Sequence, residues 1–285
     1  MANIWITGAN GQLGTTFRHK SFSLLDELFF TDVDELDITH KKAVFSFIET
    51  HDIDTIINCA AYTAVDRAEE EVEMAERVNR DGVANLAHAA YELGCLLIHI
   101  STDYVFDGMQ QTPYTEKVPA NPRTVYGRSK WEGEKAVQKS GCLHIIIRTG
   151  WLYSDYGSNF VKTILRLSEE RPELNVVNDQ WGTPTYAGDL ADMILQILDM
   201  DDLVEHEGIY HYSGGGSCTW YDFAREIVSL SGRSCQVNPV TTDLFPSKAK
   251  RPAYSVLDKT KICDTFDVVL PDWRDSLRKV VNSDV

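Results

Sequence analysis

A stretch near the N-terminus decides the fold class: Asn3-Ile4-Trp5-Ile6-Thr7-Gly8-Ala9-Asn10-Gly11-Gln12-Leu13-Gly14. The apolar run over residues 3–7 predicts a buried strand, and the glycine-rich turn after it opens a helix that we expect to reach about residue 20. Strand, glycine turn and helix in this order are the context of a dinucleotide-binding turn. Backbone without side chains can approach a pyrophosphate there, and the helix N-terminus supplies free N–H groups. We therefore expect Gly8, Gly11 and Gly14 to contact a dinucleotide, the alternative being a merely flexible turn.

An acidic residue follows the second expected strand, residues 27–31. Asp32 lies 18 positions beyond Gly14, close to the separation at which a carboxylate accepts hydrogen bonds from the adenosine ribose. The alternative is a solvated acidic turn. No Arg or Lys occurs between Asp32 and His40 to meet a 2′-phosphate, so this ground alone favours NADH over NADPH.

Strands and helices alternate along the first half of the chain. Asn79 falls near the inward face of one helix, where a polar side chain needs a partner. The alternation predicts an α/β fold with a doubly wound parallel sheet and helices on both faces, whose ligands bind at the carboxyl edge of the strands. The segments are a helix over 39–51 with Thr39 as a candidate N-cap, a strand over 54–60, a helix over 71–93, a strand over 95–100, a loop over 108–123, a helix to about 139 and a strand over 143–149.

Tyr126 and Lys130 lie four residues apart in the helix that follows the proline-containing loop. Residues at this spacing project from the same helix face. An ammonium beside a phenol favours the phenolate, so we expect Lys130 to lower the pKa of Tyr126 from its ordinary value near ~10. This arrangement suits proton exchange at neutral pH, although two exposed residues on one face are an alternative reading of the pair alone.

Past Gly150 the alternation loosens. We expect residues 1–150 to form a dinucleotide-binding domain, to which segments around 186–212 return, and residues 151–285 to form mainly a smaller α/β substrate-binding part. The expected elements are helices over 159–170, 189–200 and 219–231, the last capped by Thr219 or Trp220, and strands over 175–177 and 208–212.

Charge and composition narrow the function classes. The formal net charge of −16 makes nucleic acid an unlikely partner because polyanions are repelled. None of the six cysteines forms a CxxC pair, and Cys59, Cys95 and Cys142 are expected to be reduced core residues. The eight histidines show no metal-binding spacing. Without a signal peptide or an apolar run long enough for a membrane span, we expect a cytoplasmic protein.

Several segments together resemble the extended short-chain dehydrogenase/reductase family, and within it the dTDP-4-dehydrorhamnose reductases. The resemblance runs nearly from end to end of the chain. The segments that carry it are Gly8 to Gly14, Asn58 to Asp66, Ser101 to Gly108, Tyr126 to Lys130, Arg148 to Trp151, and Asn178 to Thr185.

The resemblance implies a Rossmann-like fold and reduction of the 4-keto group of dTDP-4-dehydro-6-deoxy-L-mannose to dTDP-L-rhamnose, with NADPH or NADH. Tyr126 is then the general acid, Lys130 orients the ribose and tunes the tyrosine, and Thr102 hydrogen-bonds the substrate oxygen. The remaining implied contacts are Gly11, Gln12, Leu13, Asp32, Asp37, Ile38, Ala61, Tyr62 and Thr63 for the cofactor, and Asp103, Tyr104 and Trp151 for the sugar nucleotide.

Arg251 precedes a proline in a basic loop, and we expect it to meet the substrate pyrophosphate, with a solvated surface arginine as the alternative. The expected assembly is a homodimer. Some relatives dimerise through magnesium held by glutamates, but Thr16 stands where one such glutamate is expected, so no metal is predicted.

Three other functions remain open at this stage. A nucleotide-sugar 4,6-dehydratase carries Asp-Glu after the threonine, whereas this chain has Asp103-Tyr104. A nucleotide-sugar 4-epimerase has a different run after its serine. A non-catalytic NADP-binding regulatory subunit, like that of methionine adenosyltransferase, shares the tyrosine and the lysine.

Overall fold

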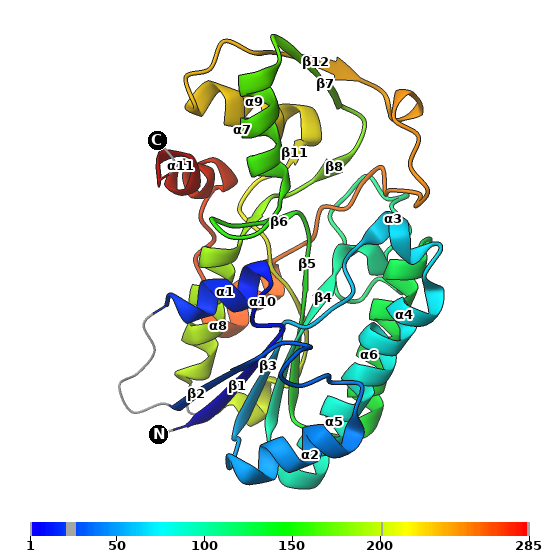
Figure 1. Cartoon of the computed structure of the whole chain (residues 1–285), viewed down its shortest axis with the longest axis vertical. Helices are drawn as coiled ribbons and strands as arrows, with labels where there is room; N and C mark the ends of the chain where they lie inside the picture. Colours follow the sequence, from blue (N-terminus) through cyan, green and yellow to red (C-terminus); the bar gives the residue numbers. More distant parts are fainter. Residues whose placement is uncertain (1, 21–26, 201, 284–285) are drawn as a thin grey trace.

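The central element is a parallel sheet (Figure 1). The computed structural model describes residues 2–20, 27–200 and 202–283. In this part of the chain six strands build the sheet, which confirms the predicted doubly wound α/β fold. From one edge to the other the strands are β2 (Glu27–Thr31), β1 (Asn3–Thr7), β3 (Thr55–Asn58), β4 (Leu96–Thr102), β5 (His144–Thr149) and β10 (Gly208–His211).

The inner strands β3 and β5 are buried on both faces and are built around runs of isoleucine. All six residues of β5 and all four of β3 are buried. Such continuous apolar runs are typical of parallel strands covered on both sides. Strand order reverses at β1, which pairs with β2 on one side and β3 on the other. Ligands of doubly wound sheets bind at this switch point, beyond the carboxyl ends of the strands.

Helices cover both faces of the sheet, as Figure 1 shows. One face packs on Leu13, Phe17 and Leu190 and the other on Val44, Leu86 and Val137. The first group of helices is α1 (Gln12–Arg18), α8 (Ala187–Leu198) and α10 (Thr260–Phe266); the second is α2 (Lys41–Thr50), α5 (Val83–Leu93) and α6 (Val125–Ser140).

The long helix expected over residues 71–93 contains a widened turn. It consists of α4 (Val72–Glu76), a π-helical turn η1 (Arg77–Gly82) and α5. Such π-turns are frequent at functional sites. The turn contains Asn79, whose side chain is fully buried. Periodicity did not predict the turn, because it depends on the partners that Asn79 finds in three dimensions.

The C-terminal part lies beyond the carboxyl edge of the sheet, at the top of Figure 1. Its core joins Val161, Phe223 and Trp273 from three helices. The elements are α7 (Phe160–Glu170), α9 (Trp220–Leu230), α11 (Trp273–Ser283), the parallel pair β7 (Glu173–Val177) and β12 (Gln236–Val240), the antiparallel pair β8 (Trp181–Gly182) and β11 (Cys218–Thr219), and the parallel pair β6 (Leu152–Tyr153) and β9 (Thr185–Tyr186). The short segments η2 (Asp103–Val105), α3 (Val65–Ala68), η3 (Leu203–His206) and η4 (Thr242–Leu244) complete the described elements.

Two helix starts test the capping predictions. Helix α9 begins at Trp220 with Thr219 as its N-cap, in a reciprocal capping box with Asp222. Helix α2 begins at Lys41, so the expectation that Thr39 is its N-cap is wrong. The backbone N–H of Thr39 instead donates to the Asp37 carboxylate at 2.8 Å.

No helix in the described ranges is both long enough and apolar enough to cross a membrane.

Helix α6 packs closely on the π-turn through a glycine. A methyl group at Gly133 would lie 2.2 Å from the backbone oxygen of Asn79. Overpacking costs about 1–3 kcal/mol, whereas helix propensity favours alanine by about 1 kcal/mol. We expect Gly133→Ala to lower the free energy of unfolding, measured by urea denaturation, by up to about 2 kcal/mol.

Gln138→Ala, at an exposed position of the same helix, is the matched control and should change stability by less than about 0.5 kcal/mol. A Gly133→Ala protein more stable than the parent would contradict the packing argument.

Candidate active site

A cleft of about 970 Å³ opens beyond the carboxyl ends of the strands. Its walls come from the loops after β1, β2, β3 and β4, from the start of α6 and from the C-terminal part. All residues assigned to cofactor or substrate from the sequence line this cleft: Gly8, Gly11, Gln12, Leu13, Gly14, Asp32, Asp37, Ile38, Ala61, Tyr62, Thr63, Thr102, Asp103, Tyr104, Tyr126, Lys130, Trp151 and Arg251. Residues scattered over most of the chain therefore meet at one place.

The glycine turn forms a cradle that side chains would fill. Gly8 has a φ of +63°, and a methyl group there would lie 2.6 Å from the backbone nitrogen of Ala60. A methyl group at Gly14 would lie 2.4 Å from the Gly8 oxygen. Gly11 is the N-cap of α1 and has no capping side chain. The N–H groups at the start of α1 therefore face the cleft uncapped, which fits the pyrophosphate of a dinucleotide.

Asp32 holds the glycine turn in place. Its carboxylate accepts the backbone N–H groups of Asn10 and Val33, each at 2.8 Å. Because a carboxylate has about four acceptor sites, it retains capacity for ribose hydroxyls. Asp37 and Ile38 lie farther along the same wall of the cleft.

The segment Ala61–Thr63 is fixed by Asn79. The amide oxygen of Asn79 accepts the Tyr62 N–H at 2.8 Å, and its nitrogen donates to the Tyr62 carbonyl oxygen and to the Ser129 hydroxyl, each at 3.0 Å. The expectation that Asn79 needs a partner is confirmed. One buried amide thus connects the wall after β3 to helix α6.

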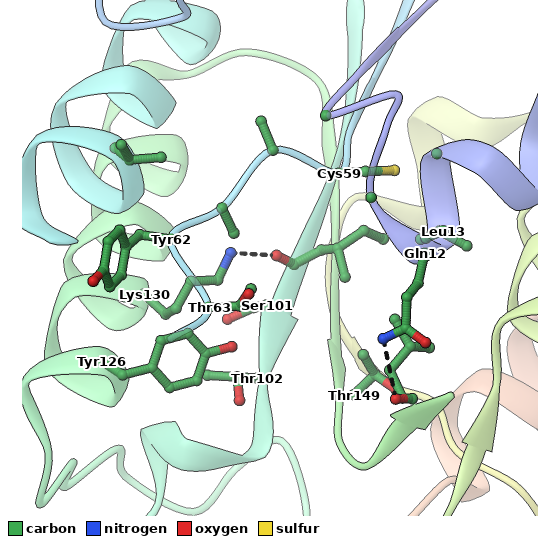
Figure 2. Close-up of a pocket in the computed structure, with 18 of the residues that line it drawn as sticks. Gln12, Leu13, Cys59, Tyr62, Thr63, Ser101, Thr102, Tyr126, Lys130 and Thr149 are labelled. Carbon is green, nitrogen blue, oxygen red and sulfur yellow. Dashed lines mark hydrogen bonds between the residues drawn. The ribbon is translucent and has the colours of Figure 1, made fainter. Parts of the chain in front are cut away.

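Thr102, Tyr126 and Lys130 converge at the centre of the cleft. Figure 2 shows the Tyr126 hydroxyl directed toward Thr102, while the Lys130 side chain lies on the same face of α6. Thr102 ends strand β4 and is 3% exposed, and Lys130 is 2% exposed. The Lys130 ammonium donates to the backbone oxygen of Ile100 at 2.6 Å.

The expectation that Lys130 lowers the pKa of Tyr126 is wrong. Burial raises the pKa of Tyr126 to about 12, and a hydrogen bond with Thr102 offsets this only in part. The Lys130 ammonium is directed at the Ile100 carbonyl oxygen and not at the phenol. The desolvation of the phenol therefore determines the direction in which the pKa of Tyr126 shifts. A phenol with a raised pKa remains protonated at neutral pH and can act as a proton donor.

Asp103 and Tyr104 follow Thr102 on the wall of the cleft. The Thr102 hydroxyl donates to the Asp103 carboxylate at 3.1 Å and accepts the backbone N–H of Tyr104 at 3.2 Å. Burial raises the pKa of Asp103 to about 6. The Tyr104 ring meets the Tyr126 ring edge to face, with centroids 5.6 Å apart.

Trp151 packs closely against Trp220 and Gly182. Its indole stacks on Trp220 with centroids 3.4 Å apart, and a methyl group at Gly182 would lie 2.4 Å from the indole. Its backbone has a φ of +50°, which is strained for a non-glycine residue. Trp220 also lines the cleft. Nothing in the sequence pointed to this position except its place at a helix start.

Arg251 reaches the cleft from the loop after β12. Its guanidinium donates to both oxygens of Asp66, at 3.1 and 2.8 Å. In the same loop Lys248 pairs with Glu70. The expected pyrophosphate contact would therefore involve an arginine that Asp66 already orients.

Two groups of cleft-side residues were missed from the sequence. The Gln12 side-chain oxygen accepts from Ser154 and Asn159, each at 3.1 Å, so the glycine turn is tied to the C-terminal part. Beneath Thr102, Glu134 and Arg148 form a buried ion pair. An arginine inside an apolar strand is the signal that could have revealed this pair, because a buried charge requires a partner.

The cysteines are free thiols. Cys95 and Cys142 are buried as expected, whereas Cys59 is half-buried: it packs against the core on one side and lines the cleft on the other, so its assignment to the core holds only in part. In the described residues no three His, Cys, Asp or Glu side chains are grouped as metal ligands.

Comparisons with known proteins identify the family. The chain is 44% identical to a dTDP-4-dehydrorhamnose reductase of Aggregatibacter actinomycetemcomitans, over 98% of each chain. Solved dTDP-4-dehydrorhamnose reductases from Clostridium acetobutylicum (43% identity, TM-score 0.94) and from Bacillus anthracis in complex with NADP (38% identity, TM-score 0.93) each align over 99% of both chains. The family described as the RmlD substrate binding domain matches residues 1–285. The chain therefore belongs to the RmlD substrate binding domain family.

Proposed function

We propose that this protein is an NAD(P)H-dependent reductase that converts dTDP-4-dehydrorhamnose to dTDP-L-rhamnose. The observation that carries the proposal is the meeting of a protonated Tyr126, the Thr102 hydroxyl and a glycine cradle in one cleft. The relatives are named for this same activity, and one of them was solved in complex with NADP. NADPH is the proposed cofactor, with NADH accepted.

The residues of the cradle fit a dinucleotide cofactor. Gly8, Gly11 and Gly14 would leave room for the pyrophosphate, Asp32 would hold the adenosine ribose, and Lys130 would hold the nicotinamide ribose. When bound, the dihydronicotinamide supplies the hydride that adds to C4 of the sugar.

The chain supplies the proton. As the carbonyl oxygen at C4 gains negative charge, Tyr126 transfers its phenolic proton to that oxygen, and a new O–H bond replaces the phenolic one. The Thr102 hydroxyl, whose proton points to Asp103 in this structure, would turn that proton to the same oxygen and so give the developing charge a second donor. The phenolate that this transfer leaves regains a proton from water.

The rival enzyme functions fit this cleft less well. Elimination of water requires a further acid–base group, but a half-buried Tyr104 occupies the position after Asp103. A regulatory binding protein needs no proton donor, whereas burial keeps Tyr126 a protonated phenol in this cleft, with its hydroxyl directed toward Thr102.

We further propose that residues 1–150, with segments around 186–212, bind the dinucleotide and that residues 151–285 mainly bind the substrate. Strand β10 pairs with β5 in the main sheet, which supports the return of the later segment.

A cytoplasmic homodimer is also proposed by similarity to this family. Light scattering should then give a mass near twice the 32.2 kDa of one chain, and a mass near 32.2 kDa would contradict it.

Replacing the proton donor tests the function. We expect Tyr126→Phe to lower kcat by a factor on the order of 10²–10⁴, because general acid catalysis contributes this much. The assay follows the absorbance of NADPH, and separately NADH, after addition of dTDP-4-dehydrorhamnose. NADPH affinity, measured by fluorescence, should change little.

Wild-type protein that binds NADPH but oxidises neither cofactor with this sugar would contradict the proposed substrate. Near wild-type turnover by Tyr126→Phe would contradict the proposed acid.

Arg251 tests the substrate pyrophosphate site. A charge-assisted hydrogen bond contributes about 1.5–3 kcal/mol, so Arg251→Ala should raise the KM for the sugar nucleotide about 10- to 100-fold and leave NADPH affinity unchanged. Lys248→Ala, which removes a neighbouring cation of the same loop, is the control and should leave KM within about twofold. An unchanged KM in Arg251→Ala would assign the arginine to the Asp66 contact alone.

A further inference from the structure

A buried polar network lies directly behind the site. Glu134 is 1% exposed and Arg148 is 4% exposed. The Arg148 guanidinium donates to both Glu134 oxygens, at 2.9 and 2.6 Å. The Ser101 hydroxyl donates to the same carboxylate at 2.5 Å. A network this deeply buried is costly if any member is lost.

The network joins the three elements that carry the reacting groups. Ser101 is in β4 immediately before Thr102, and Glu134 is in α6 one turn after Lys130. Arg148 is in β5, the next strand of the sheet. The position of Thr102 relative to helix α6 is therefore set partly by the Glu134 carboxylate.

Glu134 also supplies negative charge near the buried ammonium of Lys130. Residues four apart on a helix are neighbours on one face. Burial lowers the pKa of Lys130 to about 8, and the charge of Glu134 opposes this decrease. The direct contact of the ammonium is a neutral backbone oxygen, that of Ile100.

The other titratable groups around Lys130 do not replace this charge. Burial raises the pKa of the Cys59 thiol to about 12 and lowers the pKa of His99 well below its ordinary value, so both are neutral at pH 7. Tyr126 is a protonated phenol. The positive charge of Arg148, on β5, is paired with the carboxylate itself.

We propose that Glu134 is a positioning residue for the reduction: it keeps Lys130 charged and holds α6 against the end of β4. This inference rests on the proposed function for its catalytic meaning, but Lys130 can be observed through cofactor binding alone. A purely structural ion pair would hold the helix in place without setting the pH range over which Lys130 acts.

The pH dependence of NADPH affinity separates these two roles. The charged Lys130 would hold the nicotinamide ribose, so affinity should fall as the pH rises through the pKa of Lys130. Removing the carboxylate charge in Glu134→Gln lowers that pKa, so the loss of affinity should begin about one pH unit lower. The alkaline limb of kcat should move in the same direction, by an amount set by the pKa of Lys130 in the complex.

The matched control is Glu132→Gln, on the same helix, where the carboxylate pairs with Lys135 near the surface. The alkaline limb of its pH profile, both for NADPH affinity and for kcat, should coincide with that of the wild type. A Glu134→Gln protein whose limb also coincides with the wild type, despite native folding, would overturn the proposal.

Loss of Glu134 leaves Arg148 unpaired, and this variant could unfold. The double variant Glu134→Gln/Arg148→Met contains neither buried charge of the pair and should shift the limb in the same direction by a smaller amount, because the positive charge of Arg148 is removed together with the carboxylate. An unshifted limb in the folded double variant would likewise overturn the proposal. The NADPH titration requires no sugar, so failure of the proposed substrate would remain distinguishable from failure of this inference.

Discussion

The site depends on how closely helix α6 approaches its neighbours. A methyl group at Gly127 would lie 2.2 Å from the Tyr104 carbonyl oxygen, and one at Gly133 equally close, at 2.2 Å, to that of Asn79. These two glycines let the helix backbone lie against the segment after β4 and against the π-turn at once. Tyr126 and Lys130, on the same helix, are thereby brought beside Thr102 and beside the wall after β3. Larger residues would separate the proton donor from the hydroxyl that it faces.

Close packing has an electrostatic consequence. Each charge carried into this region loses hydration and requires compensation. Glu134 and Arg148 compensate each other, but Lys130 has a neutral carbonyl oxygen as its direct partner. Buried ion pairs contribute little net stability compared with apolar residues of similar size. A role in setting the charge and position of Lys130 gives this pair a function that stability alone does not explain.

The sequence predicted those features that local patterns determine. The run before Gly8 and the glycine spacing located β1 and its turn, and continuous apolar runs located β3 and β5, because buried parallel strands need little else. The short elements β12 and α10 were missed, since a proline and polar residues obscure their periodicity. The partners of Glu134 and the direction of the Tyr126 pKa were also inaccessible, because both depend on burial by elements distant in sequence.

The direction of that pKa bears on the type of reaction. Epimerases and dehydratases that recycle their cofactor must first oxidise the sugar, so their tyrosine begins as a base. A reductase begins with a ketone and requires a proton donor. Burial raises the pKa of Tyr126 to about 12, which disfavours the phenolate at neutral pH. An alkoxide is more basic still, with water itself near a pKa of about 15.7, so transfer from this phenol to the reduced oxygen is downhill. A tyrosine that stays protonated at neutral pH is thus in the state that a reduction requires at its start.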